Sequence, residues 1–221
     1  MKAQIKAFVF DVYGTLFDVH SVKEKCDELY PGKGEEISTV WRQKQLEYSF
    51  LRQLMGRYEP FLEVTRSALH YALAKLELPL SNSNEEDLIA AYKKLTPYPE
   101  VEAVLKQLQP KERAVFSNGS PDMLNPLIES SSLSSYIDKI ITVDDIKHYK
   151  PTPASYQHAL THLGLKREEI LFMSSNGWDI TGAKSFGFQT AWINRQNLPK
   201  EELGITPNRI YKDLTGILEW D

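Results

Sequence analysis

The sequence is poor in cysteine, lacks a long hydrophobic run and carries no excess of positive charge. Its one cysteine, Cys26, cannot form a disulfide within the chain, and no apolar stretch approaches the ~20 residues of a membrane-spanning helix. The apolar run ahead of Asp11 is too short for a secretory signal, so we expect a cytoplasmic protein with no membrane partner. With 26 Lys and Arg against 30 Asp and Glu, the net charge is -4, and nucleic acid is not an expected partner.

What is present has the composition of an ordinary globular protein. Hydrophobic residues make up 42% and charged residues 25% of the 221 residues, so a sizeable core can form without a disulfide or a metal. Short apolar runs bounded by Gly, Pro, Ser or Asn predict buried strands at residues 5–10, 113–117, 139–143, 169–174 and 189–194. Helical periodicities lie between them, for example at 101–108 and 156–163. This alternation predicts an α/β fold with a doubly wound, Rossmann-like parallel sheet.

The stretch 19–96 departs from this alternation. It has helical periodicities at 62–76 and 88–95, an N-cap signal in the loop 81–87, and no convincing strand. We therefore predict an all-helical cap inserted directly after the first strand. Residues 1–18 and 97–221 are assigned to the core domain, and residues 19–96 to the cap domain.

Polar residues collect where the predicted strands end. They are Asp11, Ser117 with Asn118, Lys150, and the run 174–179. Ligands of open α/β sheets bind at the carboxyl ends of the strands, so we predict one site built from four loops. Asp11 is the candidate nucleophile, because a carboxylate at a strand end can attack a substrate. An Asx turn or a helix cap is the alternative for Asp11, and the string D-V-Y-G-T-L favours catalysis.

Four motifs, taken in order, carry a family resemblance. They are FVFDVYGTLFD, VFSNGS, HYKPTPASY and FMSSNGWDITGAK. Together they resemble the haloacid dehalogenase superfamily, and specifically its L-2-haloacid dehalogenase branch, over essentially the whole chain. The resemblance implies the Rossmann-like core with its helical cap, and a small 2-haloacid as substrate.

Tyr13 separates this branch from the phosphatases of the same superfamily. Those phosphatases carry an acid two residues after the nucleophile, and Tyr13, with a reference pKa of ~10, replaces it poorly. They also hold Mg²⁺ with an acidic cluster after the fourth strand, where this chain has SSNGWD with Asp179 as its one acid. We therefore expect a metal-independent enzyme with no cofactor. The resemblance places Tyr13 among the substrate-binding residues.

Further roles follow from the resemblance. Asp11 attacks the carbon that bears the halogen and forms an ester, and Arg42 receives the halide. From the residues alone, Arg42 would be a solvated cap arginine. The side chains expected around the substrate near Arg42 are Gln43, Leu46, Phe61 and Trp178.

The remaining site residues surround Asp11. Lys150 balances its charge in place of a metal, and Thr15 hydrogen-bonds its carboxylate or caps a helix. Asp179 is the expected base for ester hydrolysis, with a helix N-cap as the alternative. Ser174 and Asn176 are expected to position Lys150 and the water. The residues expected to bind substrate on this side are Ser117 and Asn118, which could equally form a turn, and Tyr156, which periodicity alone places in a helix core.

These roles predict a hydrolase that acts on carbon–halide bonds, of the (S)-2-haloacid dehalogenase type. It would convert short 2-haloalkanoic acids to 2-hydroxyalkanoic acids with inversion. The alternatives are a phosphatase or phosphomutase of the same fold, and a catalytically silent binding protein. A homodimer is possible. His158 and His162 have the i,i+4 spacing of metal ligands, but no third ligand is evident in the sequence, so we predict no metal site.

Overall fold

A single parallel sheet forms the core of the computed structural model, which describes residues 4–220. Its strand order is β5-β4-β1-β6-β7-β8, and every neighbouring pair is parallel. The strands are β1 (Ala7–Phe10), β4 (Glu112–Ser117), β5 (Lys139–Thr142), β6 (Ile170–Ser174), β7 (Gln189–Ile193) and β8 (Arg209–Tyr211). The first five confirm the strands predicted from apolar runs. The edge strand β8 was not predicted, because it is short and largely exposed and so has no apolar run.

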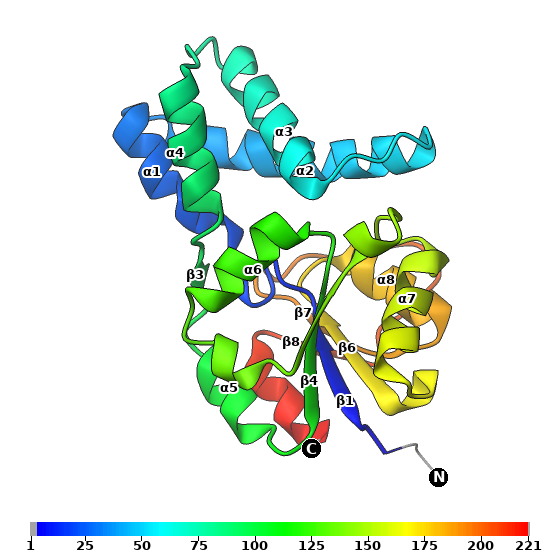
Figure 1. The fold of residues 1–221 in the computed structure, drawn as a ribbon. Coiled ribbons are helices and arrows are strands. Elements are labelled where there is room, and N and C mark those ends of the chain that lie inside the picture. Colours follow the sequence, from blue (N-terminus) through cyan, green and yellow to red (C-terminus); the bar gives the residue numbers. More distant parts are fainter. Residues whose placement is uncertain (1–3, 221) are drawn as a thin grey trace.

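Helices cover both faces of the sheet, as the predicted doubly wound fold requires. Figure 1 shows α7 (Pro153–Leu163) and α8 (Gly177–Phe186) on one face and α5 (Val101–Gln107) and α6 (Pro121–Glu129) on the other. The C-terminal 3-10 helix, Leu214–Trp220, packs against α5. All four residues of β1 are buried, which fits a central strand covered on both faces.

Four helices lie between the strands β2 (Phe17–Asp18) and β3 (Thr96–Pro97): α1 (Lys23–Leu29), α2 (Gly34–Leu54), α3 (Phe61–Lys75) and α4 (Asn82–Tyr92). Figure 1 shows them together at one end of the molecule, beyond the sheet. We call these four helices the cap. Strands β2 and β3 pair antiparallel, so the chain enters and leaves the cap at one place. That the cap and core fold as separate domains stays a prediction.

Packing inside the cap fixes the position of α2. Trp41 of α2 is fully buried, and the centre of its ring lies 5.0 Å from the ring centre of Tyr92 on α4. At Gly34 the first turn of α2 passes so close to α1 that an added Cβ would overlap the Lys23 carbonyl oxygen. Cys26 is fully buried at the same end of the cap, where burial raises the pKa of its thiol to about 12.

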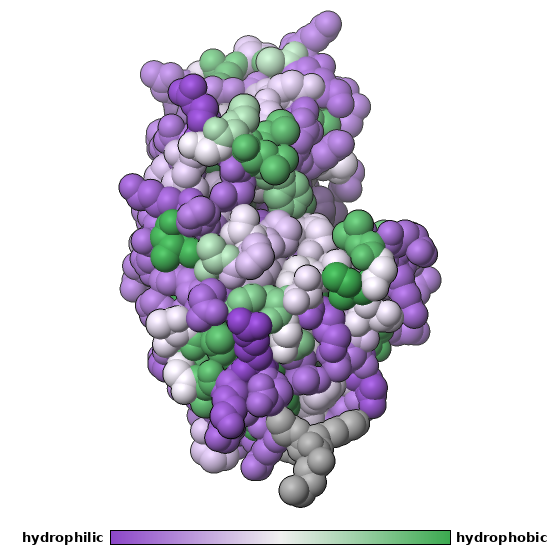
Figure 2. Space-filling model, turned by 90° about the vertical axis from the view of Figure 1, so that its right-hand side faces the viewer, coloured by the Kyte–Doolittle hydropathy of each residue, from purple (hydrophilic) through white to green (hydrophobic). Residues whose placement is uncertain are grey.

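The surface carries hydrophobic residues in small separate groups on the face shown in Figure 2. Isolated exposed apolar side chains are normal on a folded protein and need no partner to explain them. Among residues 4–220, none of the helices is long and apolar enough to span a membrane.

Candidate active site

Asp11 lies at the point where the strand order reverses. Its strand, β1, has β4 on one side and β6 on the other, and the backbone N–H of Asp11 donates to the carbonyl of Met173 on β6 at 2.8 Å. The loops after β1, β5 and β6 meet around its carboxylate through Thr15, Lys150 and Asn176. The side chain of Asp11 is 7% exposed, so its charge must be compensated by nearby groups.

Lys150 supplies that compensation. Its Nζ lies 2.9 Å from Oδ1 of Asp11 and 2.7 Å from Oδ2 of Asp179, and it also donates to the carbonyl of Phe116 at 3.2 Å. Burial alone would lower the pKa of Lys150, but the attraction of both carboxylates outweighs it and raises the pKa. The side chain therefore stays an ammonium between two carboxylates.

Asp179 is an interior residue of α8, not its N-cap. It is fully buried, with Oδ2 bound to Lys150 and Oδ1 accepting from the Tyr156 hydroxyl at 2.8 Å. Burial raises the pKa of Asp179 to about 6, against the lowering effect of the Lys150 ammonium. A carboxylate with such a pKa accepts a proton more readily near neutral pH than an ordinary aspartate does.

The second carboxylate oxygen of Asp11 is held by two neutral donors. Thr15 Oγ1 donates to Oδ2 at 2.9 Å, and Asn176 Nδ2 donates to it at 3.0 Å. Asn176 is the N-cap residue of α8, yet its side chain makes no capping hydrogen bond and contacts Asp11 instead. Thr15 is oriented by the backbone N–H of Ser175, which donates to its hydroxyl at 2.8 Å. Ser174 Oγ accepts from the backbone N–H of Asn176 at 3.1 Å and so shapes this turn.

Arg42 reaches the site from the cap. Its Nη2 donates to the carbonyl of Tyr13 at 3.3 Å, and Asn176 Nδ2 lies 3.4 Å from the same oxygen. Its Nη1 donates to Oε1 of Gln45 at 2.7 Å, and Gln45 is itself fully buried. Arg42 is therefore a positioned cation and not a solvated surface arginine.

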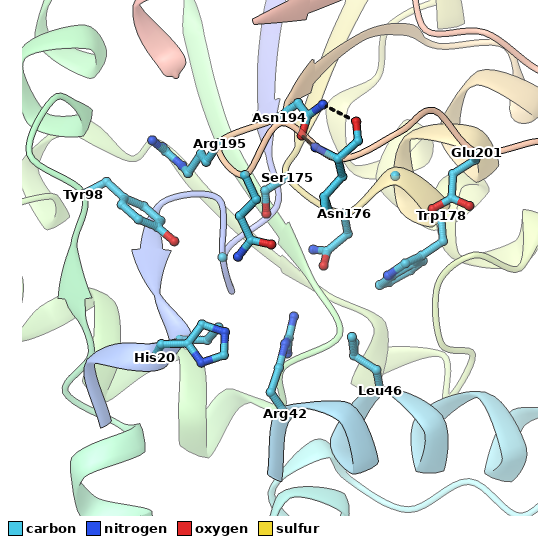
Figure 3. Close-up of a pocket in the computed structure, with 15 residues that line it drawn as sticks. His20, Arg42, Leu46, Tyr98, Ser175, Asn176, Trp178, Asn194, Arg195 and Glu201 are labelled. Carbon is cyan, nitrogen blue, oxygen red and sulfur yellow. Dashed lines mark hydrogen bonds between the residues drawn. The ribbon is translucent and has the colours of Figure 1, made fainter. Parts of the chain in front are cut away.

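A cavity of about 290 Å³ lies between α2 and the loops of the core. Figure 3 shows Arg42 and Leu46 directed from α2 toward Asn176 and Trp178 of the core. The indole of Trp178 is held by an edge contact to Phe50, with ring centres 5.0 Å apart. The wall thus combines a guanidinium with apolar side chains, and Asn176 joins it to Asp11.

Several predicted substrate-binding residues lie elsewhere. Gln43 is exposed and does not line this cavity, so its role in substrate binding stays a prediction. Phe61 is buried against Tyr13, with ring centres 5.6 Å apart, and is not part of the cavity wall. Tyr156 supports Asp179, as described above. Ser117 and Asn118 serve the turn: Ser117 Oγ accepts from the N–H of Gly119, and the Asn118 side chain accepts from the N–H of Lys150.

Tyr13 itself is buried between aromatic rings of the cap. Besides Phe61, it packs against Tyr92 with ring centres 6.0 Å apart. Among the residues described, its hydroxyl has no hydrogen-bond partner, and burial raises its pKa well above the usual value. The hydroxyl therefore stays protonated.

Sequence reasoning missed Arg195, which lines the cavity, and Gln45, which lies buried behind the wall and binds Arg42. Arg195 stacks 3.8 Å above the ring of Tyr98 and donates to the carbonyl of Thr15 at 2.9 Å. It follows β7 directly, so the strand-end argument that identified Asp11 could have found it. Gln45 stands three residues after Arg42, a spacing that places two side chains on one helix face, whereas adjacent residues such as Gln43 point apart.

The geometry defines a buried carboxylate paired with a buried ammonium at the carboxyl end of a parallel sheet. The profile of haloacid dehalogenase-like hydrolases matches residues 5–187. The chain belongs to this family.

Its relatives narrow the assignment to the 2-haloacid dehalogenase branch. The chain is 45% identical to the (S)-2-haloacid dehalogenase of Pseudomonas sp. (strain YL) over 97% of its own length and 94% of the relative's. Identity to the (S)-2-haloacid dehalogenase of Xanthobacter autotrophicus is 51%, over 86% of this chain and 76% of that one. The structure of L-2-haloacid dehalogenase from Xanthobacter autotrophicus with chloropropionic acid covalently bound superposes with a TM-score of 0.90 at 43% identity, covering 97% of both chains.

Proposed function

We propose that this chain hydrolyses short 2-haloalkanoic acids to 2-hydroxyalkanoic acids, with inversion, through an ester of Asp11. The observation that carries the proposal is the pairing of a buried nucleophile with the Lys150 ammonium at 2.9 Å. The similarity to a dehalogenase seen with chloropropionic acid covalently bound supports a covalent intermediate. Displacement of halide needs an in-line carboxylate and a stabiliser for the leaving anion, and no proton for the leaving group.

In the first step, a carboxylate oxygen of Asp11 attacks the carbon that bears the halogen. The new carbon–oxygen bond forms as the carbon–halogen bond breaks, and the halide leaves with the bonding electron pair toward Arg42. The Asp11 carboxylate is held by hydrogen bonds from Lys150, Thr15 and Asn176. It therefore loses little orientational freedom when it attacks the substrate. Approach opposite the leaving halide inverts the carbon.

In the second step, water attacks the carbonyl carbon of the ester. Asp179 takes one proton from the water and gives it to the alkoxide oxygen as the hydroxy acid leaves with one of the original Asp11 oxygens. The other water proton remains on the Asp11 carboxyl. Lys150 and Asn176 already donate to the carboxylate of Asp11, so they also stabilise the negative charge that develops on its oxygen. The released proton passes to solvent, which restores both carboxylates.

A phosphatase or phosphomutase activity is less well supported. The hydroxyl of Tyr13 stands where a phosphatase has its general acid, and it is held protonated at neutral pH. The Asp11 carboxylate already has Nζ of Lys150 as its counter-charge at 2.9 Å. A silent binding protein would have no use for an ammonium buried between two carboxylates, because burying such charges is costly.

A single turnover in ¹⁸O water, with enzyme in excess, tests the covalent step. We expect the label in Asp11 and unlabelled oxygen in the new hydroxyl of the product. Asp11→Asn should release no halide, and Asp179→Asn should accumulate the alkylated enzyme, which intact-mass spectrometry detects. Label found directly in the product hydroxyl would instead make Asp11 a general base. Halide release from a panel of 2-haloacids, beside a generic phosphate ester, tests the substrate class.

Two further proposals concern the cellular compartment and the oligomeric state of the enzyme. We propose that it works in the cytoplasm, which the single buried thiol of Cys26 supports. The homodimer that the resemblance implies is tested by sedimentation equilibrium of the purified chain.

A further inference from the structure

A cluster of potential metal ligands lies on α7. Asp145 ends a short 3-10 turn, Val143–Asp145, that follows β5, and His158 and His162 are one turn apart on α7. One ligand atom from each of the three residues lies within 4.8 Å of the others. None of the three belongs to the wall of the active-site cavity. The sequence shows the two histidines, and the fold brings the third ligand beside them.

The hydrogen bonds of the cluster leave an imidazole nitrogen of His162 available to bind a metal ion. Nδ1 of His162 lies 3.0 Å from the carbonyl oxygen of His158. A carbonyl oxygen only accepts, so Nδ1 carries the proton and Nε2 of His162 keeps its lone pair. Nε2 of His158 lies 3.3 Å from Oδ2 of Asp145, and the two imidazole rings have centres 4.2 Å apart.

We propose that Asp145, His158 and His162 bind a divalent transition-metal ion of the Zn²⁺ class. Two imidazole nitrogens and a carboxylate oxygen are a donor set that suits Zn²⁺, with ligand distances of ~2.0 to 2.2 Å. Ligands at that radius lie ~3.3 Å apart in a tetrahedron, a spacing that His158 and Asp145 already have. Asp145 and His162 are exposed, so water completes the coordination.

The ion would stabilise the segment that carries Lys150. It would join the turn after β5 to α7, and Lys150 lies on the chain between these two elements. The residue next to Asp145, Asp144, accepts a hydrogen bond at 2.6 Å from Tyr58, which lies in the loop between α2 and α3 of the cap. Metal binding would therefore raise thermal stability without taking part in the chemistry, since Lys150 provides the positive charge at Asp11.

Titration of untagged protein with Zn²⁺, after dialysis against a chelator, tests the proposal. Calorimetry should detect one ion per chain. At ten times the dissociation constant, the ion should raise Tm by about 3 to 6 °C for a chain of this size. His162→Gln and, separately, His158→Gln should abolish both effects. His70→Gln is the matched control, because His70 is an exposed histidine of α3 paired with Glu85 outside the cluster.

The outcomes separate this site from the catalytic one. Zn²⁺ binding and a Tm rise that persist unchanged in His162→Gln would overturn the proposal, and so would equal losses in His70→Gln. Halide release, measured on the same samples at 25 °C, should be the same with and without Zn²⁺. A rate that requires Zn²⁺ in both wild type and His162→Gln would contradict the proposed reaction and leave the surface site unaffected.

Discussion

Replacing Lys150 with methionine would remove the cation between two buried carboxylates and keep a side chain of similar length. Nζ lies 2.9 Å from Asp11 and 2.7 Å from Asp179, and Lys150 is 1% exposed. At an effective dielectric constant of ~20, each pair at such a distance is attracted by about 6 kcal/mol, and desolvation of the ions cancels much of that gain. Removing one partner of a buried pair costs ~3 to 5 kcal/mol. We expect Lys150→Met to lose this much free energy of unfolding at pH 8.

The loss should depend on pH in a definite direction. Without the ammonium, the two carboxylates repel each other, and the folded variant keeps a proton that the unfolded chain releases near pH ~4. The folded state then binds more protons than the unfolded state, so stability falls as pH rises, by up to ~1.4 kcal/mol per pH unit. The loss relative to wild type should be smaller at pH 5 than at pH 8, and urea unfolding at both values measures it.

A double variant provides the control. Lys150→Met with Asp179→Asn leaves one buried carboxylate and should regain most of the stability at pH 8, while halide release stays abolished. Because the second substitution removes a charge and little volume, recovery would trace the loss to electrostatics and not to packing. If Lys150→Met unfolds like wild type at both pH values, Lys150 does not balance the two carboxylates in the way described.

Four further results are expected. Arg42→Ala should lower kcat by ~10² to 10³, because it removes a preorganised charge contact to the leaving halide. A kcat near the wild-type value would contradict this role of Arg42. The pH profile of kcat should fall below about pH 6 as Asp179 takes up a proton, and a limb near pH 4 would exclude it as the base. Exhaustive chelation should leave the initial rate of halide release unchanged, and recovery of a lost rate with Mg²⁺ would favour the phosphatase alternative. Tyr13→Phe should raise the free energy of unfolding, measured in urea, by ~1 kcal/mol, because it removes a buried hydroxyl that has no partner among residues 4–220. If that hydroxyl binds substrate, the same variant should also raise KM.

The core half of the site could be predicted because sheet topology determines it. Asp11, Thr15, Lys150, Asn176 and Asp179 follow or adjoin buried strands, and parallel strands bring their carboxyl ends to one edge. The structure accordingly joins all five through hydrogen bonds. The chemical roles of these five residues stay proposals. That their side chains lie close together can be predicted from the order of the motifs along the chain.

The cap half could be predicted less well, because helix periodicity identifies a face and not what that face contacts. Leu46 and Arg42 line the cavity and Gln43 does not, while Gln45, which the sequence does not single out, binds Arg42. Gln45 is identified by the tertiary contacts it makes: it holds Arg42, and its Nε2 donates to Thr65 of the next helix at 2.7 Å. Position in a helix alone does not reveal such a network.

The antiparallel pair of β2 and β3 has a consequence for how this architecture can change. The cap begins and ends at two adjacent points, where Phe17 faces Pro97 and Asp18 faces Thr96. A different insertion could be grafted there without shifting any register of the parallel sheet. Because the proposed nucleophile belongs to the core and the cation proposed to receive the halide belongs to the cap, such a graft would replace that cation and keep the carboxylate. The two proposed functions therefore lie on parts of the chain whose backbone connections run side by side through two residue pairs.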